Sequence, residues 1–273
     1  METFKQGQTS DIPATIYGGK AANLSELVNA GFNVPPGFVY SPEEIYPLFG
    51  FGMPEDRPSQ TAMLERHVEE ICGGFPVAVR SSAIGEDGDG FSFAGQYDTV
   101  LNIFTAADVM RAIGAVAASA NNDRVESYKE ANTLEAALEA GVGVIVQAMV
   151  RPASAGVMFT AEPVESDPSL IAIEAVQGLG DKMVSGQASP DFHLLDKITG
   201  VTVESTCIND PVLGRTEINA LYEAGVAIES HYGCPQDIEW AFGLDSNGER
   251  GLFILQARPI TTLEVLTELD KGC

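Results

Sequence analysis

The sequence has few basic residues and lacks any long apolar run. Among its 273 residues, 15 are lysine or arginine and 39 are aspartate or glutamate, which gives a net charge of −24 at pH 7. Nucleic acid backbones are met by basic protein surface, so this balance argues against nucleic acid as a partner. It argues against an anionic membrane surface too, and no apolar stretch approaches the roughly 20 residues that a membrane helix requires.

Other familiar sequence signals are also absent. The first ten residues contain no apolar core, so we expect no signal peptide and a cytoplasmic protein. The Walker phosphate-binding motif, G-x-x-x-x-G-K-[ST], does not occur. The cysteines form no CxxC pair, so their spacing gives no sign of a metal knuckle or a redox motif; they are Cys72, Cys207, Cys234 and Cys273.

The remaining composition is that of a globular protein, with 45% hydrophobic residues. The length suits one large domain or two lobes with a substantial core. Helical spacing of apolar residues follows Gly18-Gly19 and recurs in the segments 61–72, 106–120 and 218–230. Strand patterns fall at 77–80, 99–103, 142–147, 156–160, 170–176, 237–242 and 252–256. Mixed helices and strands predict an α+β protein.

The segment from Val77 to Ile103 has the strongest local signal. Arg80 follows a short apolar run and ends a predicted strand, and a loop rich in glycine, serine and aspartate comes next. A guanidinium offers a rigid fork for phosphate oxygens, and glycines let backbone N–H groups approach an anion. The segment therefore indicates polyphosphate binding, with an ordinary surface loop as the alternative. The glycine-rich stretch 85–95 is predicted to be a mobile lid.

A hairpin near the C-terminal end is predicted to gather four polar side chains. Asn247-Gly248 lies between two predicted strands, and Asn-Gly is typical of a tight two-residue turn. That turn would place Glu239 opposite Gln256 and Asp237 opposite Arg258. Directly opposite residues share one face of a sheet, and oxygen ligands beside a cation can hold Mg²⁺ against ATP. The alternative is a solvated hairpin face with an ordinary Asp–Arg pair.

Three more polar residues are candidates for nucleotide contacts. Lys20 begins a predicted helix after two glycines, where a lysine can hold phosphate as a point charge; the alternative is an exposed surface lysine. Thr99 enters a strand, and Gln147 ends an apolar run. A glutamine at that place can bind an adenine edge, or it can be a satisfied amide in the core.

Four motifs, in this order, give a family resemblance. They are GGKAANLSEL (18–27), AGFNVPPGFV (30–39), QDIEWAF (236–242) and FILQARPIT (253–261). Together they resemble the N-terminal ATP-grasp domain of phosphoenolpyruvate synthase, pyruvate phosphate dikinase and rifampin phosphotransferase. The looser segments VIVQAMV (144–150) and AGVMFTAEP (155–163) also fit this pattern.

The resemblance implies a two-lobed ATP-grasp fold with ATP bound in the cleft between the lobes. It assigns residues 1–263 to that domain and residues 264–273 to the start of the linker that follows it in the family. The matching residues imply Glu239 and Gln256 as Mg²⁺ ligands and Lys20, Arg80 and Arg258 as phosphate ligands. Further nucleotide contacts would come from Thr99, Gln147 and Asp237, and with weaker specificity from Glu174 and the loop 177–186.

The resemblance also implies a dikinase-type phosphotransfer. ATP would be cleaved to AMP and phosphate, and the β-phosphoryl group would pass to a histidine and then to pyruvate or to a phenol or alcohol. The family's Thr/Ser-His-Ala segment and its acceptor-binding barrel have no match here. We therefore expect a partner protein to supply both. The alternatives are a self-contained ATP-grasp ligase, which would yield ADP, and a non-catalytic nucleotide sensor.

Overall fold

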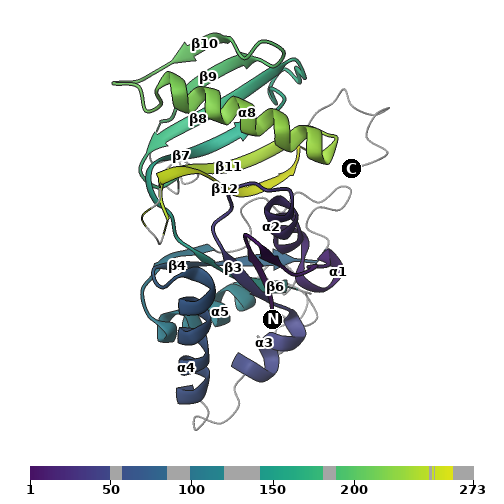
Figure 1. Ribbon diagram of the computed structural model, residues 1–273, viewed down its shortest axis with the longest axis vertical. Helices are drawn as coiled ribbons and strands as arrows, with labels where there is room; N and C mark the ends of the chain where they lie inside the picture. Colours follow the sequence, from purple (N-terminus) through teal and green to yellow (C-terminus); the bar gives the residue numbers. More distant parts are fainter. Residues whose placement is uncertain are drawn as a thin grey trace. The chain divides into compact units, whose positions relative to one another are not determined.

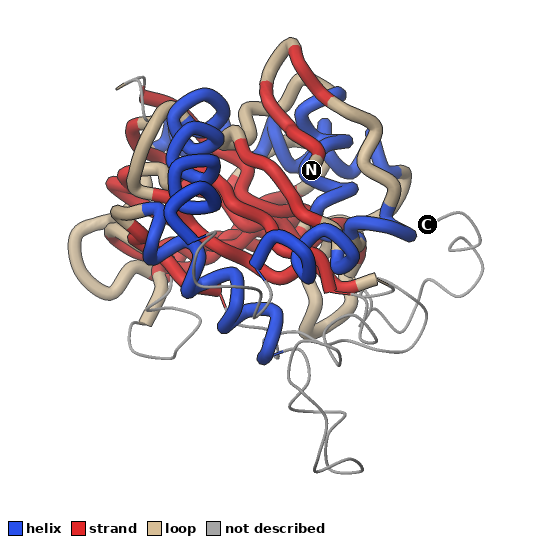
Figure 2. Tube along the Cα trace, turned by 90° about the horizontal axis from the view of Figure 1, so that it is seen from below, coloured by secondary structure: helices blue, strands red, loops and turns tan. Residues whose placement is uncertain are grey.

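The computed structural model divides the chain into two compact units. The first contains Met1–Met149 and Asp245–Gly248, and the second contains Val150–Leu244 and Glu249–Cys273. The structure describes residues 1–49, 57–84, 99–119, 142–180, 189–245, 248 and 250–260. Each unit combines helices with a six-stranded antiparallel sheet, and helices and strands are both found throughout the described chain (Figure 2). The predicted α+β class and the two lobes are therefore confirmed.

The first unit is built on a sheet with the strand order β2-β1-β3-β6-β4-β5 (Figure 1). Its strands are β1 (Glu2–Lys5), β2 (Gln8–Thr9), β3 (Gly37–Tyr40), β4 (Val77–Ala83), β5 (Thr99–Ile103) and β6 (Val142–Ala148). Its helices are α1 (Ala14–Tyr17), α2 (Gly19–Asn29), α3 (Pro42–Phe49), α4 (Arg57–His67) and α5 (Ala106–Ser119), and a π-helical turn, η2 (Val68–Cys72), continues α4.

Helices lie on both faces of this sheet. One face packs against α4, η2 and α5 and forms the main core, to which the sheet contributes Phe38, Tyr40, Val77, Val79, Val144 and Val146. The opposite face meets α2, where the backbone N–H of Ala21 donates to the Ser82 hydroxyl at 3.0 Å. Gly18 precedes α2 with a φ of +86°, and a Cβ there would lie 2.3 Å from the Ser82 carbonyl oxygen. Glycine is therefore required where α2 begins against β4.

The second unit contains a sheet with the strand order β10-β9-β8-β7-β11-β12. Its strands are β7 (Arg151–Phe159), β8 (Leu170–Gln177), β9 (Asp191–Asp196), β10 (Thr202–Thr206), β11 (Gln236–Leu244) and β12 (Arg250–Pro259). One long helix, α8 (Arg215–Tyr232), lies across one face of this sheet (Figure 1).

The two faces of this second sheet differ in character. On the face under α8, alternate residues such as Met158, Ile173 and Ile238 are fully buried. Gly225 of α8 approaches this face so closely that a Cβ there would lie 2.9 Å from the Met158 methyl group. The intervening residues, including Glu174 and Glu239, lie on the opposite face and are only half-buried. Period-two alternation therefore separates an apolar face from a face with ionisable side chains.

The predicted periodic segments are confirmed as α2, α4 with η2, α5 and α8 and as the strands β4 to β8, β11 and β12. The short elements β1, β2, β3, α1 and α3 were not predicted, and neither was β10. In the part of the chain that the structure describes, no helix combines the length and the apolar character needed to cross a bilayer.

Gly156 gives a stability prediction for the second unit. A Cβ at this position would lie 1.9 Å from the Glu174 carbonyl oxygen and 2.7 Å from the Trp240 ring. Gly156→Ala should therefore destabilise this unit by about 1–3 kcal/mol, as overpacked cores do. Trp240 is the chain's one tryptophan and is fully buried, so urea unfolding followed by its fluorescence measures the change.

Gly180→Ala is the matched control, because a Cβ there would make only an ordinary contact of 3.6 Å. Its unfolding midpoint should stay close to that of the parent protein. Equal midpoints for the two variants would contradict the steric role of Gly156.

Candidate active site

The pairing of β11 with β12 brings together the four polar residues predicted from the hairpin. Asp237 lies opposite Arg258, and Glu239 lies opposite Gln256. Both predicted pairs are confirmed. Since opposite residues share a face, all four side chains belong to the face of the sheet that α8 leaves uncovered. We call Asp237, Glu239, Gln256 and Arg258 the hairpin quartet.

The register of the quartet is set by a bulge. The predicted two-residue turn at Asn247-Gly248 is wrong, because Leu244 pairs with Arg250 and five residues lie between them. This longer loop shifts the strands by one residue. The extra residue Leu255 then shifts them back, because Trp240 pairs with Ile254 whereas Glu239 pairs with Gln256. A β-bulge re-aims the side chains beyond it, and here it restores the predicted pairs.

Arg258 is held in place by its cross-strand partner. Its Nε and Nη2 atoms donate to one carboxylate oxygen of Asp237, at 2.9 and 2.7 Å. The Asp237 side chain is 14% exposed, whereas that of Arg258 is 36% exposed. The contact fixes the guanidinium while part of it still faces solvent. An arginine positioned in this way is suited to a bidentate contact with a phosphate group.

The uncovered face carries carboxyl groups whose ionisation is opposed by burial. Burial raises the pKa of Asp237, and the nearby Glu239 carboxylate adds to the rise, while Arg258 lowers it. Burial also raises the pKa of Glu174. Val157 pairs with both Glu174 and Glu239, so these two glutamates lie two strands apart, about 10 Å. A bound cation would favour the charged form of all three groups.

In the first unit, Lys20 and Arg80 both lie near the place where the start of α2 contacts β4. Lys20 is the second residue of α2, and the contact of Ala21 with Ser82 fixes this helix start against β4. Arg80 lies two residues before Ser82 on the same strand and pairs with Thr99 of β5. Lys20 and Arg80 are half-buried, and Thr99 is exposed. The anchoring contact of Ser82 was not predicted, because only the fold reveals it.

Gln147 occupies the same sheet face as Arg80, because it pairs with Ala78 of β4. The side chain is 3% exposed, and its amide donates to the carbonyl oxygen of Pro35 at 3.1 Å. This contact fits the alternative of a satisfied core amide. Its predicted contact with adenine stays a prediction.

Two further sequence predictions cannot be located. The predicted lid at 85–95 lies outside the described residues, and so does most of the loop 177–186.

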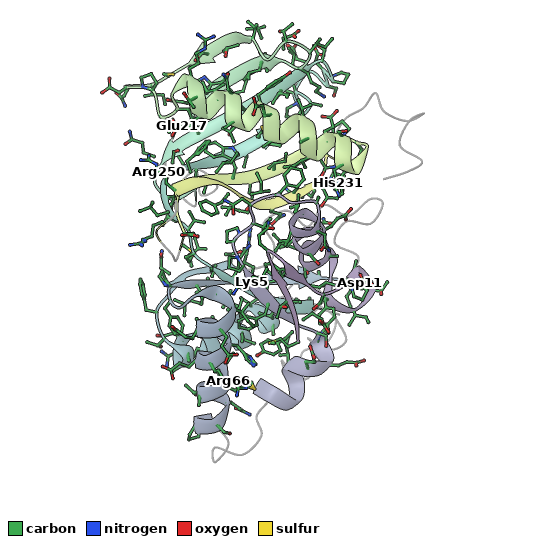
Figure 3. The ribbon with its side chains drawn as sticks, in the orientation of Figure 1. Lys5, Asp11, Arg66, Glu217, His231 and Arg250 are labelled. Carbon is green, nitrogen blue, oxygen red and sulfur yellow. The ribbon has the colours of Figure 1, made fainter. Side chains whose placement is uncertain are left out.

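The three histidines have different surroundings. His67 is half-buried, and its Nδ1 atom lies 3.1 Å from the Tyr40 hydroxyl. His193 is 2% exposed. His231 lies exposed in the last turn of α8, at the end opposite Glu217 (Figure 3). His231 makes an edge-to-face contact with the ring of Tyr232.

Comparison with known proteins places these observations in a family. The family model for the pyruvate phosphate dikinase AMP/ATP-binding domain matches residues 52–210 and 196–271. A probable phosphoenolpyruvate synthase from Methanothermobacter thermautotrophicus is 35% identical over 93% of this chain and 45% of its own length. A rifampicin phosphotransferase from Bacillus cereus is 30% identical over 94% of this chain and 35% of its own length.

Solved structures show a looser likeness. The D-alanine–D-alanine ligase from Helicobacter pylori aligns with a TM-score of 0.44 and 10% identity, over 91% of this chain and 55% of the ligase. This likeness is too weak to bear on the assignment, which rests on the family match. The chain spans less than half the length of the curated relatives named above. It belongs to the family of the pyruvate phosphate dikinase AMP/ATP-binding domain.

Proposed function

We propose that this chain is the ATP-binding part of a dikinase-type phosphotransferase. ATP and water would give AMP, phosphate and a phosphorylated histidine on a partner protein. The β-phosphoryl group would then pass to pyruvate or to a phenol or alcohol. Family membership supports ATP binding. The observation that carries the proposal is the hairpin quartet, in which two oxygen donors and a fixed guanidinium share the sheet face opposite α8.

The quartet has the donor chemistry of a magnesium site. Glu239 offers a carboxylate and Gln256 an amide oxygen, and both are hard ligands. Mg²⁺ takes few protein ligands and completes its shell with water and phosphate oxygens, so two residues suffice. When bound, Mg²⁺ would neutralise phosphate charge and polarise the phosphoryl group. Burial raises the pKa of Asp237, and perturbed pKa values are frequent at functional sites.

The basic residues would hold the phosphate groups. Arg258, oriented by Asp237, would place its guanidinium against phosphate oxygens. Lys20 would add a point charge where the N–H groups at the start of α2 favour an anion. Arg80 would contribute a second fork, with the Thr99 hydroxyl beside it. Positioning and charge neutralisation of this kind are the main protein contributions to phosphoryl transfer.

A partner protein would supply the phosphate-accepting histidine. Two of this chain's three histidines, His67 and His193, are engaged within the fold, and the third lies exposed at the end of α8. Each curated relative is more than twice as long as the part that matches this chain. Both observations support a division of the reaction between this domain and other domains.

Removal of the metal ligands should weaken Mg²⁺-dependent nucleotide binding. Glu239→Gln loses the anionic ligand, and Gln256→Ala loses the amide oxygen. We expect each variant to bind Mg²⁺–ATP ~10- to 100-fold more weakly, as measured by calorimetry. Glu204→Gln on the exposed edge strand β10 is the control and should bind like the parent protein. Parent-like affinity in both ligand variants would overturn the metal assignment.

Arg80→Lys tests the phosphate fork. Lysine keeps the positive charge but cannot donate two parallel hydrogen bonds. The affinity for ATP or the turnover rate should therefore fall at least ~10-fold, which corresponds to about 1.4 kcal/mol of free energy. The control is Arg111→Lys, because the Arg111 side chain is 74% exposed and pairs with Asp108 of the same helix. If the two variants bound and turned over ATP equally well, Arg80 would have a structural role.

The transfer itself can be followed with ATP labelled at the β-phosphoryl group. The isolated chain should bind ATP and turn it over slowly. Addition of a protein with the phosphohistidine and acceptor-binding domains should give AMP and an acid-labile label on that protein. Production of ADP would favour a ligase, and binding without turnover under any condition would favour a nucleotide sensor.

Replacement of His67, His193 and His231 in turn provides the matched controls. Each replacement should leave the labelling of the partner in place. Stable labelling of one of these three histidines in the isolated chain would contradict the need for a partner.

A further inference from the structure

The hairpin β9–β10 brings together three side chains that can bind a metal ion. Ser205 pairs with His193, and Thr206 pairs with Phe192. One residue beyond the end of β10, Cys207 therefore falls beside Asp191. Asp191, His193 and Cys207 each offer a ligand atom, and these atoms all lie within 4.8 Å of one another. We call these three residues the β9 cluster.

His193 has a nitrogen that is left for a ligand. The side chain is 2% exposed, and its Nδ1 atom lies 2.9 Å from the Ser205 hydroxyl. Its Nε2 atom is buried and has no hydrogen-bond partner among the described residues. Buried ring nitrogens are normally paired, so an orphaned one calls for an explanation.

The neighbouring contacts hold the cluster together. Asp191 accepts backbone hydrogen bonds from Ile208 at 3.1 Å and from Val212 at 2.8 Å. Each carboxylate oxygen has two lone pairs, so one on each remains for a cation. The Ser205 hydroxyl lies 3.8 Å from the Cys207 sulfur. The segment after β10 is thus fixed beside β9.

A cavity borders the β9 cluster and gives room for a solvent ligand. Its volume is about 580 Å³. Residues of the cluster form part of its wall, and the start of α8 forms another part; the lining includes His193, Ser205, Cys207, Leu213, Arg215 and Ile218. The cavity has room for water, and its wall offers polar partners such as Ser205 and Asn219.

We propose that Asp191, His193 and Cys207 bind Zn²⁺, with a water molecule from the cavity as the fourth ligand. Imidazole nitrogen, thiolate sulfur and carboxylate oxygen are the ligand types of zinc sites. Thiolate disfavours Mg²⁺ and Ca²⁺, which prefer oxygen. Ligand atoms of a tetrahedral zinc ion lie about 3.5 Å apart, so the cluster needs only a small contraction.

The ring nitrogens of His193 then have separate roles. In the proposed site the ion takes Nε2, the ring nitrogen without a hydrogen-bond partner among the described residues, while Nδ1–H donates to the Ser205 hydroxyl and so fixes the tautomer and the orientation of the ring. In metal-binding histidines, the ring nitrogen that does not bind the metal almost always donates such a hydrogen bond. The zinc ion would tie β9 to the segment between β10 and α8.

This site is independent of the proposed nucleotide function. Phe192 lies in the same cross-strand row as Glu174, Val157 and Glu239. Asp191 and His193, which flank Phe192 on β9, therefore point to the opposite face, under α8. The β9 cluster and the hairpin quartet lie on opposite faces of one sheet.

Titration with Co²⁺ and then with Zn²⁺ tests the proposal on the full chain after treatment with a chelator. We expect one equivalent of Co²⁺ to give a thiolate-to-cobalt charge-transfer band that Zn²⁺ abolishes by displacement. Cys207→Ser should remove the band and weaken Zn²⁺ binding ~10- to 100-fold. Ser205→Ala should keep the band and weaken binding to a smaller extent. His231→Gln, at the far end of α8, is the control and should behave like the parent protein.

A second measurement makes the outcome independent of the cobalt spectrum. Zn²⁺ bound to the folded state alone should raise the unfolding midpoint that Trp240 fluorescence reports. The rise should vanish in Cys207→Ser, which is half-buried and conservative and should therefore fold. Absence of the band in the parent protein, or a band and a midpoint shift that persist in Cys207→Ser, would overturn the proposal.

Discussion

The pairing of β11 with β12 is the constraint on which the chemistry of the second unit depends. The side-chain period of a strand is two, so a slip of one residue would turn Gln256 and Arg258 to the opposite face from Glu239 and Asp237. The loop of five residues introduces such a slip, and the bulge at Leu255 cancels it. The loop and the bulge each shift the pairing by one residue in opposite directions, so together they keep the four polar side chains on one face. Natural β-bulges often have this role near functional sites.

The proposed nucleotide site has to hold an anion on an acidic protein. A net charge of −24 opposes the approach of ATP at long range, but salt screens diffuse surface charge beyond about 10 Å. Local groups decide the outcome at contact distance. Arg258 is fixed by a buried carboxylate and keeps part of its guanidinium exposed. Burial opposes the ionisation of Asp237 beside it, so a divalent cation bound next to Asp237 would favour its charged form.

Much of the fold could be predicted because its elements are long and periodic. The helices α2, α5 and α8 follow the apolar spacing of their sequences, and most of β6 is an apolar run that ends at Gln147. Short elements such as β1 and β3 carry too few residues to show a period. The quartet was predicted from cross-strand arithmetic, although the assumed turn was wrong. The pairs are right because the bulge compensated, and no sequence rule predicts a bulge at Leu255.

The β9 cluster marks the limit of sequence analysis more clearly. Cys207 and His193 are 14 positions apart, and the chain lacks the CxxC spacing that signals a metal knuckle. The two residues meet because β9 and β10 pair in antiparallel fashion, with Ser205 opposite His193. The register of this edge hairpin also depends on an irregularity in β10 between Thr202 and Glu204. Sequence motifs such as CxxC identify metal ligands that are close together in the sequence. Ligands that come from two paired strands can be identified only when the pairing register is known.

The second sheet therefore offers two kinds of donor set on its two faces. The uncovered face has carboxylate and amide oxygens, which suit a hard cation that exchanges with its nucleotide. The face under α8 has a buried imidazole and a half-buried thiol, which suit a softer cation. Side chains alternate between the two faces of a strand, so the two donor sets lie on opposite sides of the backbone. No residue of one set can therefore bind the metal ion of the other. Donor chemistry and burial together would then direct Mg²⁺ to one face and Zn²⁺ to the other, although the same strands form both faces.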